Sequence, residues 1–185
     1  MKKALLIVSV LIIAVISTAC INNIAVQELN NKAAEYMKSG DYESAVNRLQ
    51  ASIDLDSTIY ETYYNLGIAA TNAKKYDVAI DALEKGLKLK DDYSGFYYSL
   101  GVAQAEYADV LSETEVFDEE KQETKKREIS EEDKVKIKNL RESAINNLNK
   151  YIELEPTAED KKTVEQLVID LMGEEDNSQP KDSVE

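Results

Sequence analysis

The sequence predicts an all-α protein built from stacked helix pairs, and two observations carry that prediction. First, residues repeat at a spacing of 34: Tyr42 matches Tyr76, and Ala45 matches Ala79. A period of this length indicates supersecondary units stacked one on another. Second, only six glycines and two prolines occur in 185 residues, which leaves few tight turns. No segment shows the sustained two-residue alternation of a half-buried strand.

The composition excludes several classes of function. The 36 acidic residues outnumber the 22 basic ones, so the net charge of -14 argues against nucleic-acid binding, which depends on cations that neutralise phosphates. The single cysteine excludes an internal disulfide framework, and the absence of histidine removes the commonest general base and metal ligand. The chain has neither a P-loop nor a dinucleotide-binding glycine motif. We therefore predict no enzyme activity, no catalytic or metal-binding residues and no cofactor beyond a covalent lipid.

That lipid is suggested by the N-terminus. A pair of lysines precedes the apolar run 4–16, the layout of a secretory signal peptide, and the run is shorter than the roughly 20 residues of a membrane span. Ser17–Cys20 resembles a bacterial lipobox, in which a signal peptidase cuts before the cysteine and the sulfur carries a diacylglycerol. The resemblance implies a signal peptide over 1–19 and lipidation of Cys20. An uncleaved anchor and an ordinary secreted protein remain the alternatives.

Small residues recur at the repeat spacing as well, at Ala33, Gly67 and Gly101. The middle unit reads Tyr63-x₂-Leu66-Gly67 and then Ala79-x₃-Leu83, which resembles the tetratricopeptide repeat (TPR) pattern. This resemblance implies a TPR-type right-handed α-solenoid of antiparallel helix pairs with a C-terminal capping helix. The small residues would let the two helices of each repeat approach closely.

Helical spacing and start signals place the elements along the chain. Apolar residues such as Ala45, Leu49 and Ile53 fall on one helix face. Capping boxes are predicted to begin helices at Thr58, Ser130 and Thr157. The predicted helices cover 24–38, 42–55, 58–73, 76–89, 93–111, 131–154 and 158–172. The domain plan is a lipidated N-terminus and linker at 20–25, a TPR domain at 26–172 with repeats of about 26–59, 60–93 and 94–156, a capping helix at 158–172 ended by Gly173, and an acidic disordered tail at 173–185.

The third repeat is interrupted. Gly101 lies 43 residues before Ala144, whereas the matching residues of the other repeats lie 12 apart, which implies a charged insertion at about 112–138. Such a stretch is either a solvated loop or a charged helical hairpin. The apolar stripe that begins at Ile137 favours a long second helix from residue 131, with a frayed tip around 118–130. A dedicated partner-binding arm remains a further alternative.

The TPR resemblance also implies where a partner would bind, because the first helix of each repeat lines the concave face. The candidate groove residues are Asn30, Lys38, Tyr64, Ile68, Asn72, Tyr98 and Val102. Further wall positions are Met37, Thr71, Ala105 and Glu106. Tyrosine suits an interface because it offers a large amphipathic surface at low entropy cost. The carboxylate clamp of some family members is missing, since Ala34 and Ile68 stand where amides are needed. Alternatively, Tyr64 and Tyr98 only pack between repeats.

Together these features predict an exported, lipid-anchored protein of the bacterial cell membrane or outer membrane. It would be an adaptor or scaffold for another envelope protein or peptide, with no nucleic acid and no small-molecule substrate. The alternative is an accessory or regulatory subunit of an envelope enzyme or assembly machine that binds through the insertion. An envelope enzyme that uses carboxylates is a third, separate class.

Overall fold

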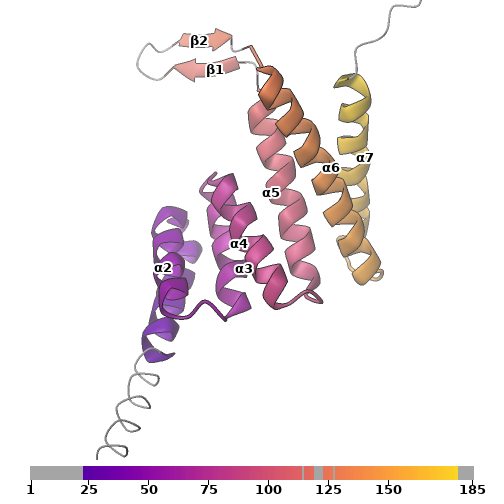
Figure 1. Cartoon of the computed structure of the whole chain (residues 1–185). Coiled ribbons are helices and arrows are strands. Elements are labelled where there is room, and N and C mark those ends of the chain that lie inside the picture. The colour runs from indigo at the N-terminus through magenta and orange to yellow at the C-terminus, as the bar shows by residue number, and fades with distance from the viewer. Residues whose placement is uncertain (1–22, 114, 119–122, 127, 179–185) are drawn as a thin grey trace, which may run out of the picture.

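The computed structural model describes residues 23–113, 115–118, 123–126 and 128–178, with side chains for 23–113 and 128–173. The described part starts with a helix over 23–39. The later elements are α2 (Tyr42–Leu55), α3 (Tyr60–Asn72), α4 (Tyr76–Leu89), α5 (Ser94–Ser112), β1 (Glu115–Asp118), β2 (Glu123–Lys126), α6 (Glu131–Leu154) and α7 (Lys161–Ser178). The helices stand side by side in a row from α2 to α7 (Figure 1). The predicted α-solenoid of antiparallel helix pairs is confirmed.

The turns between paired helices repeat with the same period as the helices. Gly40 has a φ of 80°, and Lys74, 34 residues later, has a φ of 58°. Both residues therefore adopt the left-handed conformation that ends a helix, which is uncommon for a side chain as long as lysine. After the first turn, the Asp41 carboxylate accepts a hydrogen bond from the Ser44 N–H at 3.1 Å and caps α2.

The two helices of a repeat touch where the first carries a glycine. A Cβ atom on Gly67 would overlap the side chain of Leu83, and one on Gly101 would lie 2.6 Å from Cγ of Leu148. Both distances are shorter than a carbon–carbon contact, so only glycine fits at these positions. The predicted role of the small residues is confirmed, and Leu83 and Leu148 are completely buried as a result.

The core divides into two clusters. The larger one joins the N-terminal helix to α5, and the smaller one joins α5, α6 and α7 through residues such as Leu148 and Val168. Val164, Val168 and Leu171 bury one face of α7 against the third helix pair. The predicted capping role of the last helix is confirmed, because α7 covers a face that would otherwise meet water.

The insertion differs from the predicted frayed helical tip. The second helix does begin at Glu131, and Ser130 caps it by accepting the Asp133 N–H at 3.0 Å. Between the helices, β1 and β2 pair antiparallel, with Glu115 opposite Lys126 and Val116 opposite Lys125. The hairpin projects beyond the ends of α5 and α6 (Figure 1). Four-residue strands are too short to produce an alternation that the sequence could reveal.

Three boundary predictions are wrong. Thr58 does not cap α3; its N–H and hydroxyl donate to Asp56 instead, and the helix begins at Tyr60. The box at Thr157 is not used either, since α7 begins at Lys161. Gly173 does not end this helix, which continues to Ser178, because a glycine weakens a helix by only about 1 kcal/mol.

The predicted signal peptide and Cys20 lie outside the described residues, as do residues 179–185 of the predicted tail. Within the described part of the chain, no helix has both the length and the apolar character that crossing a bilayer requires.

Candidate partner-binding groove

A hollow of about 250 Å³ lies between α3 and α5, the first helices of the second and third pairs. Its lining residues are Tyr64, Ile68, Thr71, Asn72, Tyr98, Ser99, Val102 and Glu106. Five of the seven predicted groove residues therefore come together: Tyr64, Ile68, Asn72, Tyr98 and Val102. The 34-residue period explains the pairing, because Tyr64 and Tyr98, Ile68 and Val102, and Asn72 and Glu106 occupy equivalent places in their repeats.

Tyrosines form one end of the hollow. The ring of Tyr64 meets Tyr93 edge-on at a centroid distance of 5.1 Å and Phe96 at 5.5 Å. The ring of Tyr98 lies 5.2 Å from that of Tyr151 in α6, while 36 % of Tyr98 stays exposed. The two alternatives for these tyrosines are thus combined: each packs on a neighbouring ring and also presents a surface to the hollow. Edge-to-face packing fixes ring orientation, so this end is preorganised.

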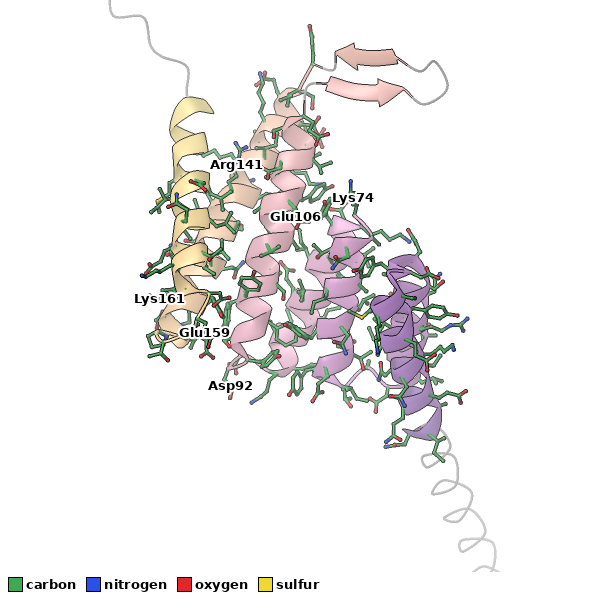
Figure 2. All side chains as sticks on the ribbon, turned by 180° about the vertical axis from the view of Figure 1, so that it is seen from behind. Lys74, Asp92, Glu106, Arg141, Glu159 and Lys161 are labelled. Atoms are coloured by element: carbon green, nitrogen blue, oxygen red, sulfur yellow. The ribbon has the colours of Figure 1, made fainter. Side chains whose placement is uncertain are left out.

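Polar groups form the other end. Thr71 donates its hydroxyl to the Gly67 carbonyl at 2.9 Å, and Asn72 donates its amide to the Ile68 carbonyl at 2.8 Å. Glu106 is the only lining residue with a formal charge at neutral pH. Figure 2 shows Glu106 and Lys74 towards the same end of the stack, opposite the end that carries Asp92.

Opposing effects act on the pKa of the Glu106 carboxyl. Burial raises the pKa of its carboxyl above the usual value, and the negative charge of Asp109 acts in the same direction. The Tyr76 hydroxyl and the Lys74 ammonium act in the opposite direction and lower that pKa. The side chain is nevertheless exposed, so a cation from a ligand can reach the carboxylate and would favour its charged form.

The remaining predicted residues lie elsewhere. Asn30 donates its amide to the Thr62 hydroxyl at 3.1 Å, so it joins the N-terminal helix to α3 and does not line the hollow. Lys38 is exposed at the end of the first helix and is also not among the lining residues. Ala105, predicted as a wall position, is buried against α6 and α7. Ser99 also lines the hollow, although it is not among the predicted residues. The signal that could have indicated it is its position next to Tyr98.

Two other hollows are larger but less suited to a specific ligand. One of about 440 Å³ lies beside α4 and includes Glu84, Lys88 and Asp91. Another of about 450 Å³ lies against the first helix and includes Lys32 and Arg48. Most of their charged side chains are exposed, and desolvating such groups opposes binding. Within the described residues, no group of three or more acidic, cysteine or histidine residues could hold a metal ion.

Comparison with known proteins agrees with this geometry. A family model described as tetratricopeptide repeat matches residues 60–93, the span of α3 and α4. The fold is that of a TPR domain. No curated protein matches the chain. The first TPR domain of human RPAP3 superposes with a TM-score of 0.60 at 18% identity, over 83% of this chain and 97% of that domain.

Two further solved structures have the same TPR architecture. The first TPR of RPAP3 bound to the HSP90 peptide SRMEEVD superposes with a TM-score of 0.58 at 18% identity, over 80% of this chain and 93% of that one. The type III secretion translocator chaperone SycD of Yersinia enterocolitica gives 0.59 at 16% identity, over 82% and 86%. Identities this low establish the fold alone.

Proposed function

We propose that the chain is an adaptor or scaffold whose TPR groove between α3 and α5 binds a segment of another protein. The observation that carries this proposal is the hollow itself, where partly exposed aromatic and aliphatic side chains meet a polar end. Its volume of about 250 Å³ falls below the roughly 300–1,000 Å³ of small-molecule pockets. It suits one or two side chains of a polypeptide better than a complete small ligand.

The structural relatives support a peptide as the ligand. A solved RPAP3 domain of this fold is bound to an HSP90 peptide, and the TPR2B domain of yeast Sti1 is in a complex with pHsp70. The chain has Ile68 where a carboxylate clamp needs an amide, and Glu106 where an acidic terminus would be repelled. We therefore expect a peptide ligand of a different chemistry from SRMEEVD.

We further propose that the domain is tethered to a bacterial membrane through a lipid on Cys20. The described residues are helical from 23 onwards, so the short segment that follows Cys20 would hold the domain close to the bilayer. Removing 1–19 would remove two lysines and no acid, and the net charge would change from -14 to -16. Such a charge disfavours flat adsorption onto anionic lipids, so the concave face stays available to a protein partner.

Metabolic labelling with a fatty acid tests the tether. The wild-type chain should take up label, and Cys20→Ala should not. Ser17→Ala is a matched control: it keeps the cysteine and should label like the wild type. Equal labelling of Cys20→Ala would exclude the lipoprotein assignment without bearing on the groove.

Crosslinking pull-downs from the native envelope test the groove. Ser99→Trp should fill the hollow and lose the captured partner, because the new ring occupies the space of the ligand. Ser57→Trp adds the same ring at an exposed turn between α2 and α3 and should retain it. Retention by both variants would contradict groove binding.

The alternative, an accessory subunit that binds through the insertion, has one observation in its favour. The β1–β2 hairpin projects beyond α5 and α6 (Figure 1). Deleting 115–126 should leave the partner bound if the groove is the site. Loss on this deletion, combined with retention by Ser99→Trp, would establish the alternative.

A further inference from the structure

The charges around the hollow indicate what kind of segment it accepts, provided that the groove binds a partner as proposed above. Among the eight lining residues, only Glu106 has a formal charge at neutral pH, and none is basic. The whole chain carries -14. An acidic segment would meet repulsion both from this carboxylate and at long range, whereas a basic segment would be attracted.

Glu106 is placed to interact with a cation from a ligand. Its side chain is exposed and lines the polar end of the hollow, where the Tyr76 hydroxyl of α4, the Asp109 carboxylate of α5 and the Lys74 ammonium of the preceding turn act on it. Asp109 adds negative charge near it, and the Lys74 ammonium favours its charged form. Because the carboxylate is exposed in the lining of the hollow, a lysine or arginine that enters can form a charge-assisted hydrogen bond with it.

The tyrosine end of the hollow lies a fixed distance from Glu106. Tyr64 precedes Asn72 by eight residues in α3, and Tyr98 precedes Glu106 by eight in α5. At a rise of 1.5 Å per residue, each pair is separated by about 12 Å along its helix. An extended peptide advances about 3.3 Å per residue, so about three or four residues span this distance.

We propose that the α3–α5 hollow binds an extended peptide segment that carries an apolar anchor and a lysine or arginine three or four residues away. The anchor lies between Tyr64 and Tyr98 over Ile68 and Val102. The basic side chain pairs with the Glu106 carboxylate. The site therefore selects basic-apolar segments and rejects acidic ones.

Three fluorescein-labelled peptides of nine residues test this specificity on the full chain by anisotropy. Each is acetylated and amidated and has one leucine in a glycine–serine background, followed four residues later by lysine, glutamine or glutamate. The lysine probe should bind most tightly and the glutamate probe most weakly. The affinity of the lysine probe should fall as salt screens the attraction between its ammonium and Glu106. Equal affinities for the three probes, or no binding by any of them, would overturn the inference.

Variants separate this inference from the proposed function. Glu106→Gln should weaken the lysine probe about fivefold, as expected for loss of one partly solvated ion pair. Glu84→Gln is the matched control, because it removes the same charge from the hollow beside α4 and should leave that affinity unchanged. Glu106→Lys should reverse the preference and favour the glutamate probe. If Glu106→Gln and Glu84→Gln bind alike, the charge pairing is wrong.

Ser99→Trp reports on the groove itself. It should abolish binding of all three probes, since it fills the hollow irrespective of ligand charge. Probe binding unaffected by Ser99→Trp would place the site elsewhere and contradict the proposed function. Binding that is lost with Ser99→Trp but is insensitive to Glu106→Gln would contradict only the ligand chemistry proposed here.

Discussion

Gly101 of α5 and Leu148 of α6 are in such close contact that a Cβ atom on the glycine would lie 2.6 Å from Cγ of the leucine. The same relationship holds between Gly67 and Leu83 in the preceding helix pair. The third pair therefore closes in the same way as the second, although the hairpin separates its two helices in sequence. Leu148 is completely buried in consequence.

Replacing this glycine should be costly. We expect Gly101→Ala to lower the free energy of unfolding by about 2 kcal/mol, because overpacking a core commonly costs 1–3 kcal/mol. Gly173→Ala is the control: it lies inside α7 with no atom within 4 Å of an added Cβ and should stabilise by up to about 1 kcal/mol. Urea denaturation measures both, and equal effects would contradict the close-packing argument.

The N-cap of α6 offers a second test. The Ser130 hydroxyl accepts the Asp133 N–H at 3.0 Å, so Ser130→Ala should destabilise the protein by about 1 kcal/mol. Thr157→Ala changes a residue that was predicted as a cap but precedes the start of α7 by four positions. It should change stability by less than about 0.5 kcal/mol. A larger loss of stability for Thr157→Ala in thermal denaturation would indicate that Thr157 caps α7 after all.

These two positions also show how far sequence reasoning reaches. The predicted bounds of the helices from α2 to α6 agree with the structure within two residues, because the 34-residue period and the helical spacing constrain one another. Capping is harder to predict, since Thr58 and Thr157 match the same motif as Ser130, yet the Thr58 N–H donates to Asp56 and α7 begins only at Lys161. The Asp41 cap of α2 was missed altogether.

A buried polar pair joins α5 to α6. Asn147 donates its amide to Oε1 of Gln104 at 2.9 Å, and Gln104 is only 6 % exposed. Asn147→Ala should cost about 1–3 kcal/mol because it leaves a buried carbonyl without a donor. A double-mutant cycle of Gln104→Leu and Asn147→Leu measures the coupling. The double variant should lose less unfolding free energy than the sum of the losses in these two single variants. Strict additivity would mean that the pair is not coupled.

Tyr151 predicts a pH dependence of stability. Burial and then its 2.9 Å hydrogen bond to Asp160 raise the pKa of this phenol to about 12. An unfolded tyrosine ionises near pH 10, so the folded state binds the proton more tightly than the unfolded state. Its contribution to stability should be complete below pH 10 and should be lost as the pH rises towards 12.

The Tyr151→Phe variant isolates that contribution from the other tyrosines. Its unfolding free energy should fall less steeply between pH 10 and 12 than that of the wild type. Denaturant titrations at intervals across this range provide the comparison. Parallel curves for the two proteins would show that Tyr151 does not link folding to proton release.

The candidate site was partly predictable for a related reason. Equivalent residues of α3 and α5 follow from the period, so Tyr64, Ile68, Asn72, Tyr98 and Val102 could be placed on one surface. The aromatic packing that orients Tyr64 against Tyr93 and Phe96 could not, because it joins α3 to the residue before α5 and to the first turn of α5. Nor could the burial of Ala105, since α7 approaches that position only in the assembled stack.

The projecting hairpin also has a consequence for the order of folding. Gly67 and Leu83 lie 16 residues apart, whereas Gly101 and Leu148 lie 47 apart. Closing a loop about three times longer costs roughly 1 kcal/mol more chain entropy. We expect α3 and α4 to form a nucleus before α6 docks, and α6 with α7 to exchange their amide hydrogens first. The chain would then assemble directionally, with the end that carries the insertion closing last.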